Sequence, residues 1–242
     1  MKRRADYGID GPGLVIGFVV VGLLLALVAG WALGSPTQRL VPVALSAASA
    51  ALAALSLAYA AVMLSSSLVG KRRVRDRLVA ALALSEGAHV LDAGCGRGLA
   101  LIGCAKQLTS GKAVGVDLWS ARDLSDNNPA ATRANAAVEG VADRIEVHTV
   151  DIRRLPFADA AFDAIISMTV IHNIASREGR DQAIGELVRV LKPGGRVAIF
   201  DLVFTRRYAE LFRRAGLEVQ RLGRHRLWLF PGESLLAQKP GP

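Results

Sequence analysis

The apolar residues of this chain follow two different patterns, one before residue 70 and one after it. Residues 14–33 are a run of 20 residues without a charged side chain, and residues 41–69 are a second, longer uncharged run rich in alanine and serine. A helix needs about 20 residues to span the hydrocarbon core of a bilayer. Because only residues 34–40 separate the two runs, we expect an antiparallel pair of transmembrane helices joined by a tight turn.

Small residues within the two runs bear on how these helices pack. Gly13 and Gly17 have Gly-x-x-x-Gly spacing. The second run carries alanines at helical spacing, at Ala47, Ala51, Ala54 and Ala58. Stripes of this kind let two helix backbones approach closely. They also arise from composition alone, so a specific helix pair and a pair without specific packing both stay open.

The charges that flank the two runs predict their orientation. Lys2, Arg3 and Arg4 precede the first run, and five positive charges lie in residues 71–77, directly after the second. The turn between the runs carries only Arg39. By the positive-inside rule, both ends of the chain and the region after residue 70 are cytoplasmic. A cleaved signal peptide is the alternative for the first run, but its apolar core is usually about 7–15 residues long, and it would leave the C-terminal region on the same side.

From about residue 74 onwards, short apolar runs alternate with helical stretches, which is typical of βαβ units around a parallel sheet. We expect helices over residues 75–84, 99–108, 129–139, 181–191 and 208–215. We expect strands over residues 89–91, 113–116, 145–150, 162–168, 196–200, 217–222 and 228–237, with a turn at Pro193-Gly194-Gly195. The pattern divides the chain into a two-helix anchor at residues 1–70 and an α/β domain at residues 71–242.

The net charge of +9 and the mean hydropathy of +0.33 refine this picture. A basic surface attracts nucleic acids and anionic membranes alike. The basic cluster at residues 71–77 directly follows an apolar run, which favours the membrane. Further arginines lie at Arg206, Arg207, Arg213, Arg214, Arg221, Arg224 and Arg226. Because no aromatic platform for stacking bases accompanies them, we expect a membrane-facing or solvated surface and no nucleic-acid partner.

The two cysteines, Cys95 and Cys104, lie nine positions apart. They lack the short-spaced pairs of a zinc site or a disulfide framework. We expect both to remain reduced in a cytosolic environment, and we expect no metal.

Three alternate glycines follow the first predicted strand of the α/β domain. Gly94, Gly96 and Gly98 come directly after Asp92 and lead into a helix. Glycine permits a sharp turn and a close ligand approach, and open α/β sheets bind ligands outside the carboxyl ends of their strands. A dinucleotide-binding loop reads Gly-x-Gly-x-x-Gly, and here Leu99 stands where its last glycine belongs. The loop instead resembles motif I of the class I S-adenosylmethionine-dependent methyltransferases.

Further features follow in the order typical of this family. Asp117 ends the second predicted strand, 19 residues after Gly98, and Asp151 ends the third. Residues 162–166 resemble the family's fourth strand, residues 191–196 the turn before its fifth, and residues 235–240 its antiparallel last strand. The resemblance covers residues 75–240. It implies a Rossmann-like, seven-stranded, mostly parallel sheet with an antiparallel last strand, S-adenosylmethionine as cofactor, and methyl transfer to a small molecule, as in quinone biosynthesis.

The same resemblance implies a role for individual residues. The loop with Gly94, Cys95, Gly96 and Gly98 would lie against the methionine part of the cofactor, with Asp92 near its ammonium group. Asp117 would bind the ribose, and Leu118 or Trp119 would pack on the adenine. Asp151 and Ile152 would contact the adenine edge. Taken singly, each carboxylate has an alternative role as a loop cap; their order at successive strand ends favours cofactor binding.

His172 is the candidate general base. It follows the fourth predicted strand, in a segment that borders the substrate pocket in related small-molecule methyltransferases. Imidazole titrates near neutral pH, which suits proton removal from an acceptor. The alternatives are that His172 is a structural hydrogen-bond partner or only lines the pocket, and Asn173 could orient a substrate oxygen. We expect His89, His148 and His225 to be structural or solvated.

The chain also carries clues to the acceptor. Methylases of nucleobase or glutamine amides usually carry an Asn/Asp-Pro-Pro-Tyr/Phe turn after the fourth strand, and residues 167–170 read Ser-Met-Thr-Val instead. In this family the helix before the first strand often covers the pocket, and here residues 75–84 follow the second apolar run almost without a spacer. We therefore expect a hydrophobic or amphipathic acceptor, such as a quinone precursor or another lipid. A non-catalytic cofactor-binding membrane protein and a dinucleotide-dependent oxidoreductase remain alternatives, and the atom methylated and the oligomeric state stay open.

Overall fold

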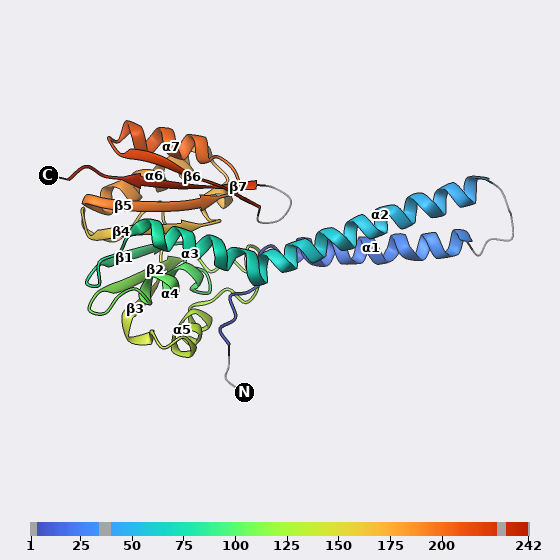
Figure 1. Cartoon of the computed structure of the whole chain (residues 1–242), viewed down its shortest axis with the longest axis horizontal. Coiled ribbons are helices and arrows are strands. Elements are labelled where there is room, and N and C mark those ends of the chain that lie inside the picture. The colour runs from blue at the N-terminus through green and yellow to red at the C-terminus, as the bar shows by residue number, and fades with distance from the viewer. Residues whose placement is uncertain (1–3, 34–39, 227–230, 242) are drawn as a thin grey trace.

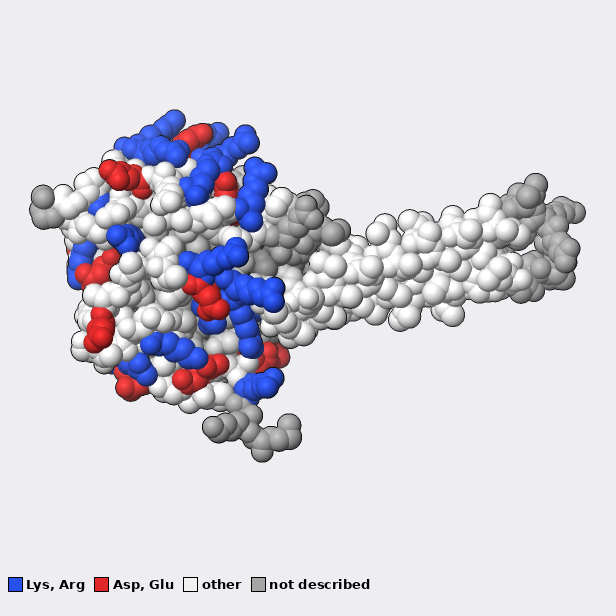
Figure 2. Space-filling model, viewed as in Figure 1, with Lys and Arg blue, Asp and Glu red and all other residues white. Residues whose placement is uncertain are grey.

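The computed structural model describes residues 4–33, 40–226 and 231–241. Two long helices, α1 (Pro12–Leu33) and α2 (Leu40–Ser65), form a hairpin that projects from an α/β body (Figure 1). Among the described residues, two helices are long and apolar enough to cross a membrane, Pro12–Leu33 and Val43–Leu82, with mean hydropathies of 2.7 and 1.9 in their most apolar stretches. Neither α1 nor α2 contains a charged residue, and the face of the hairpin seen in Figure 2 is accordingly uncharged. The predicted turn with Arg39, and Lys2 and Arg3, lie outside the described residues.

The contact between α1 and α2 uses small residues other than the predicted ones. A Cβ atom at Gly22 would come within 2.7 Å of Leu57 Cγ, and Ser56 Oγ donates a hydrogen bond to Phe18 O at 2.8 Å. The predicted packing residues are instead exposed: Gly13, Gly17, Ala47, Ala51, Ala54 and Ala58. That prediction is wrong because the buried side of α2 is the neighbouring stripe, where serine hydroxyls hydrogen-bond to carbonyls of α1.

Helix α2 runs without a linker into the α/β body. A π-helical turn, η1 (Ser66–Gly70), joins it to α3 (Lys71–Leu82), so α3 begins four residues before the predicted helix. Such turns widen the helix locally and are frequent at functional sites. Here the turn and the start of α3 direct Ser67 and Lys71 toward the same residue, Asp10, which precedes α1. The hairpin is therefore tied to the body at both of its ends.

The body is built on a seven-stranded sheet. Its strands are β1 (His89–Ala93), β2 (Lys112–Asp117), β3 (Ile145–Thr149), β4 (Phe162–Met168), β5 (Leu191–Asp201), β6 (Glu218–Arg226) and β7 (Pro231–Gln238). Their order is β3-β2-β1-β4-β5-β7-β6, with β7 antiparallel to both neighbours. This confirms the predicted Rossmann-like sheet with an antiparallel last strand. The first residues of the predicted last strand, 228–230, lie outside the described part.

Helices cover both faces of the sheet and bury its apolar side chains (Figure 1). Helices α3, α4 (Leu99–Ala105) and α5 (Pro129–Val138) contribute to one core cluster, which includes Leu78 and Ile102. Helices α6 (Arg177–Val190) and α7 (Thr205–Arg214) contribute to the second, which includes Leu187 and Phe212. Two short 3-10 turns, η2 (Ala142–Arg144) and η3 (Ile171–Asn173), complete the elements.

Several boundaries differ from the predicted ones for local reasons. Helix α6 begins at Arg177, four residues earlier, because Ser176 caps it by accepting a hydrogen bond from Gly179 N at 3.0 Å. The predicted turn at residues 193–195 lies inside β5: Phe162 pairs with Leu191 whereas Ala164 pairs with Arg196, so the residues between bulge out of register. Strand β1 continues to Ala93, which places Asp92 within the strand.

Candidate functional site

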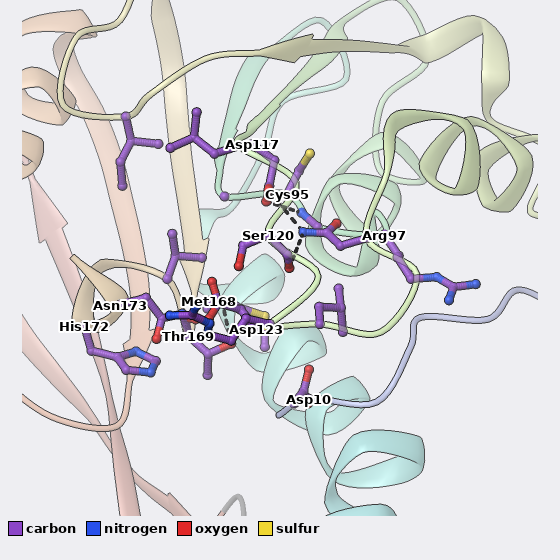
Figure 3. A pocket seen from close by; sticks show the side chains of 18 of the residues that line it. Asp10, Cys95, Arg97, Asp117, Ser120, Asp123, Met168, Thr169, His172 and Asn173 are labelled. Carbon is purple, nitrogen blue, oxygen red and sulfur yellow. Dashed lines mark hydrogen bonds between the residues drawn. The ribbon is translucent and has the colours of Figure 1, made fainter. Parts of the chain in front are cut away.

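A cavity of about 880 Å³ lies at the carboxyl ends of β1, β2 and β4. This is the edge at which open α/β sheets bind ligands. The cavity is lined by the glycine loop and by the segments that follow β2, β3 and β4, and also by the chain before and at the start of α1, including Gly13 and Leu14. Figure 3 shows Asp117 and His172 on different sides of this cavity, with Asp10 near its rim. The site thus joins the sheet edge to the base of the hairpin.

The glycine loop is shaped by close contacts that leave no room for side chains. Gly94 has a φ of +85°, and a Cβ atom there would come within 2.3 Å of Val170 Cγ2. Gly96 has a φ of +49°, and its Cβ would lie 2.9 Å from Leu124 Cδ2. The amide of Gly94 donates to Val116 O at 2.8 Å, which fixes the turn to β2. Gly98 caps α4 at a φ of +85° but does not line the cavity.

Asp92 is a buried carboxylate without a partner. It is 1% exposed, and neither of its side-chain oxygens has a hydrogen-bond partner among the described residues. Burial, together with the nearby Asp117 charge, raises the pKa of Asp92 to about 8. An unpaired buried carboxylate is costly unless a cation or a proton neutralises it. Because Asp92 lines the cavity, a cationic group of a ligand can supply that neutralisation.

Asp117 organises the loops around it. Its Oδ2 accepts from Gly96 N at 2.8 Å, and its Oδ1 accepts from Trp119 N at 2.6 Å and from Asn127 Nδ2 at 3.2 Å. Leu118 lines the cavity and is 60% exposed. Trp119 turns away from it, and its indole donates to Thr149 Oγ1 at 2.8 Å. Of the two predicted adenine contacts, the structure brings only Leu118 to the cavity wall.

The remaining predicted cofactor residues also line the cavity. Asp151 follows β3, and hydrogen bonds from Arg153 hold its pKa below the usual range. Ile152 is buried beside it. Cys95 is buried at the loop, and burial raises the pKa of its thiol; Cys104 is buried in α4, and both thiols are free. Asp92, Gly94, Cys95, Gly96, Asp117, Leu118, Asp151 and Ile152 therefore share one cavity.

His172 lies in η3 and is held by a buried carboxylate that the sequence did not reveal. Asp201, at the end of β5, is fully buried. It contacts His172 Nδ1 through Oδ1 and accepts from His172 N at 3.0 Å, from Leu202 N at 2.8 Å and from the Tyr208 hydroxyl at 3.3 Å. Burial and the Asp201 charge raise the pKa of Tyr208, which keeps it a donor. The imidazole is thereby fixed with its ring at the cavity.

The segment before α1 is a second contribution that sequence reasoning missed. Lys71 is 5% exposed, and its Nζ donates to Tyr7 O and Gly8 O at 2.8 Å and to Asp10 Oδ1 at 3.2 Å. Asn135 Nδ2 donates to Asp6 O at 2.7 Å. The segment therefore packs on α3 and α5 and closes one side of the cavity, although it precedes the hairpin in the sequence. No motif marks it, because its contacts are mostly to backbone carbonyls.

The other predicted groups lie away from the cavity. His89 begins β1 at the opposite edge, His148 lies in β3 near Glu146, and His225 contacts Arg77. Among the C-terminal arginines, Arg207 pairs with Asp181 at 2.7 Å and Arg221 with Glu233 at 2.6 Å. These two arginines are therefore partly neutralised.

Comparison with known proteins relates the site to a family. Residues 90–195 match the family described as a methyltransferase domain. The chain is 35% identical over 131 residues to the methyltransferase GfsG of Streptomyces halstedii, covering 54% of this chain and 44% of that protein. It is 35% identical over 144 residues to the ubiquinone/menaquinone biosynthesis C-methyltransferase UbiE of Geobacter sulfurreducens, covering 59% and 52%. The chain thus spans about half the length of these relatives.

A solved structure supports the fold. A SAM-dependent methyltransferase from Aquifex aeolicus superposes with a TM-score of 0.54 at 20% identity, over 68% of this chain and 88% of that one. Two features of the cavity suit the cofactor: the backbone of Gly94 and Gly96 lines it, and the buried, unpartnered Asp92 can pair with a cation such as the ammonium of S-adenosylmethionine. Over residues 90–195 the α/β domain therefore matches a methyltransferase domain and resembles the class I S-adenosylmethionine-dependent methyltransferases, and its cavity fits S-adenosylmethionine as the cofactor.

Proposed function

We propose that this protein is a membrane-anchored methyltransferase whose acceptor is a small amphipathic molecule drawn from the bilayer. One observation carries the proposal: a single cavity is lined by Asp92 and Asp117 on the cofactor side and by Gly13 and Leu14 of α1 on the other. An acceptor that lies along α1 in the bilayer reaches the cofactor without crossing water. The two parts of the chain, residues 1–70 and 71–242, then serve one reaction.

The surface of the hairpin supports the anchor. Its large apolar side chains point outward, and Leu27 and Trp31 are 70% and 74% exposed. Apolar area of this extent is unfavourable in water and favourable in hydrocarbon. The positive charges before α1 and in residues 71–77 favour a cytoplasmic α/β body. UbiE of Geobacter sulfurreducens is named for ubiquinone and menaquinone biosynthesis, which is consistent with a lipophilic acceptor here.

The residues on the cofactor side of the cavity bind and orient the cofactor. The glycine loop lets the ligand approach the backbone of β1, Asp92 pairs with its ammonium group, and Asp117 accepts from its ribose hydroxyls. When bound, S-adenosylmethionine supplies a methyl group on a sulfonium, activated for in-line displacement. Asp151 and Leu118 border the adenine. Because the cofactor carries the activation, the main task of the protein is to align the acceptor and exclude water.

His172 is the proposed general base. Its Nδ1 faces Asp201, so Nε2 is the nitrogen that accepts the proton lost by an oxygen or carbon acid of the acceptor. Asp201 is the positioning residue, since it fixes the ring orientation and stabilises the imidazolium that forms. Asn173, which also lines the cavity, is placed to orient an acceptor oxygen.

The test is to incubate membranes that contain the full chain with S-adenosylmethionine labelled on its methyl group, and then to separate lipid, protein and aqueous fractions. The proposal expects label in the lipid fraction, and loss of that label in an Asp117→Ala variant. Label in the protein or aqueous fraction alone would contradict the acceptor class. If membranes with the parent carry no more label than membranes with the Asp117→Ala variant, the result favours a cofactor-binding protein without turnover.

A further inference from the structure

The α/β body exposes large apolar side chains mainly at one edge. Outside the hairpin and η1, the large hydrophobic residues that are exposed in the described body are Leu118, Val138, Val203 and Phe204. Three of these four follow the carboxyl ends of strands, Leu118 after β2 and Val203 and Phe204 after β5. Leu202, their neighbour, lines the same cavity as Leu14 of α1. These three exposed apolar side chains therefore lie on the side of the body from which the hairpin projects.

Phe204 is held outward by an unusual backbone. Its φ is +65°, a conformation that side chains other than glycine rarely adopt. The ring is 46% exposed, and the Arg180 guanidinium lies 4.0 Å from its centroid. Arg180 is itself fixed, because its Nη1 donates to Ile174 O at 2.6 Å and to Ala175 O at 3.0 Å. An aromatic side chain is thus held in an exposed position at the N-cap of α7.

Exposed arginines lie at the starts of three helices of the body. Arg177 and Arg206 are exposed in the first turns of α6 and α7, and Arg72 and Arg73 are exposed in the first turn of α3. None of these four pairs with a carboxylate among the described residues. Figure 2 shows Lys and Arg side chains gathered on the part of the body next to the hairpin. The acids on the same edge include Glu178 and Asp123, so the surface is mixed but rich in arginine.

We propose that this edge, defined by Val203, Phe204, Arg72, Arg73, Arg177 and Arg206, rests on an anionic lipid surface. Val203 and Phe204 lie between the headgroups, and the arginines bind lipid phosphates, for which a guanidinium is well suited. The lipid is the occupant because the edge continues from the base of α1 and from η1, which enters α3 without a linker. The inference rests on the proposed membrane anchor and goes beyond it, since an anchor does not by itself place these side chains against the headgroups.

Contact at this edge has a consequence for the reaction. The cavity opens at the same edge, so contact of this edge with the bilayer places the opening of the cavity in the headgroup layer. An amphipathic acceptor then needs to move little out of the membrane. Val203 and Phe204 directly follow Leu202, which lines the cavity, and in contact with lipid they would shield that side of the opening from water.

The experiment uses the full chain with one added cysteine, since Cys95 and Cys104 are both buried. Val203→Cys carries an environment-sensitive fluorophore, and Ser110→Cys, exposed at the opposite edge before β2, is the matched control. The proteins are reconstituted in vesicles of phosphatidylcholine with phosphatidylglycerol, and in phosphatidylcholine alone. Vesicle flotation reports whether the hairpin has inserted, and label transfer to lipid by the same proteins is measured separately in native membranes supplied with labelled S-adenosylmethionine.

The proposal expects the probe at residue 203, and not the probe at residue 110, to shift its emission to shorter wavelength and to be quenched by nitroxide-labelled lipids. The shift is larger with phosphatidylglycerol and shrinks in Arg177→Gln/Arg206→Gln. Equal, unshifted emission from both sites in floated vesicles would overturn the proposal while leaving the anchor intact. Failure to float would overturn the anchor and this inference together, whereas loss of methylation with normal quenching would count against the proposed function alone.

Discussion

The unpartnered carboxylate of Asp92 makes the cofactor affinity depend on pH. Burial raises its pKa to about 8 in the free protein, and pairing with the cofactor ammonium selects the ionised form. Binding near neutral pH therefore releases a proton, and affinity falls as the pH falls. With a pKa of about 8, the ionised fraction drops from about one quarter at pH 7.5 to about one hundredth at pH 6.0, so the dissociation constant rises about 25-fold.

The perturbation that removes this dependence is Asp92→Asn, which keeps the shape of the side chain and removes the titration. We expect the variant to bind S-adenosylmethionine more weakly at pH 7.5 and with nearly the same affinity at both pH values. Isothermal titration calorimetry in buffers of different ionisation enthalpy measures the affinity and the proton release together. Asp143→Asn, at an exposed position, is the control. A parent protein whose affinity does not change between pH 6.0 and 7.5, and which releases no proton, would refute the reasoning.

The same group links stability to pH in the cofactor-free protein. The pKa of Asp92 is raised above its unfolded value of 3.8, so the folded state holds the proton more tightly. The stability that this proton gives is fully present below the unfolded pKa and is lost as the pH rises toward about 8. The amide of Asp92→Asn is uncharged at every pH, so the variant keeps this stability. We therefore expect cofactor-free Asp92→Asn to be more stable than the parent at pH 7.5 in chemical unfolding.

Three further predictions concern the loop, the base and the acceptor route. Gly94→Ala places a methyl group 2.3 Å from Val170 Cγ2 and adds a left-handed backbone cost of about 1–2 kcal/mol. We therefore expect cofactor binding that is at least about tenfold weaker in titrations. Gly140→Ala is the control and should retain affinity, because Gly140 has a φ of +71° and open space around it. Asp201→Asn frees the His172 ring, so kcat should fall and the dependence of kcat on pH should change. The affinity for the cofactor should stay near that of the parent. An unchanged pH profile of kcat would argue against the positioning role of Asp201. Gly17→Leu fills open space one turn beyond Gly13 on α1, and Gly30→Leu fills equally open space at the far end of the helix. We expect Gly17→Leu to reduce label transfer to lipid more than Gly30→Leu does. Equal effects would count against a path of the acceptor along α1.

The sequence predicted the parts of the fold that depend on local patterns. Strand β4 matches its predicted bounds, and the sheet order follows from βαβ units. The candidate cofactor residues were assigned because the family signature places them at successive strand ends. Trp119 was assigned with Leu118 because a sequence cannot tell which of two neighbours turns toward a cavity. That depends on the φ of +60° at Trp119 and on its hydrogen bond to Thr149.

Contacts between distant segments were beyond the sequence. Asp201 lies 29 positions from His172, and only the fold brings the two side chains into contact. Tyr7 and Asp10 reach the cavity through Lys71, more than 60 positions later. The small-residue stripe on α2 was placed on the wrong face, because alanine and serine stripes lie one position apart and only the hydroxyl partners on α1 decide between them.

The central claim is that the protein methylates an amphipathic molecule held in its own membrane. The most direct measurement compares lipid extracts, by mass spectrometry, from membranes with the full chain and with Asp117→Ala, both supplied with methyl-deuterated S-adenosylmethionine. The account predicts a lipid-soluble species that carries one deuterated methyl group in the first extract and is lost in the second. Identical lipid extracts, with the deuterated methyl group found only in water-soluble molecules or in protein, would contradict it.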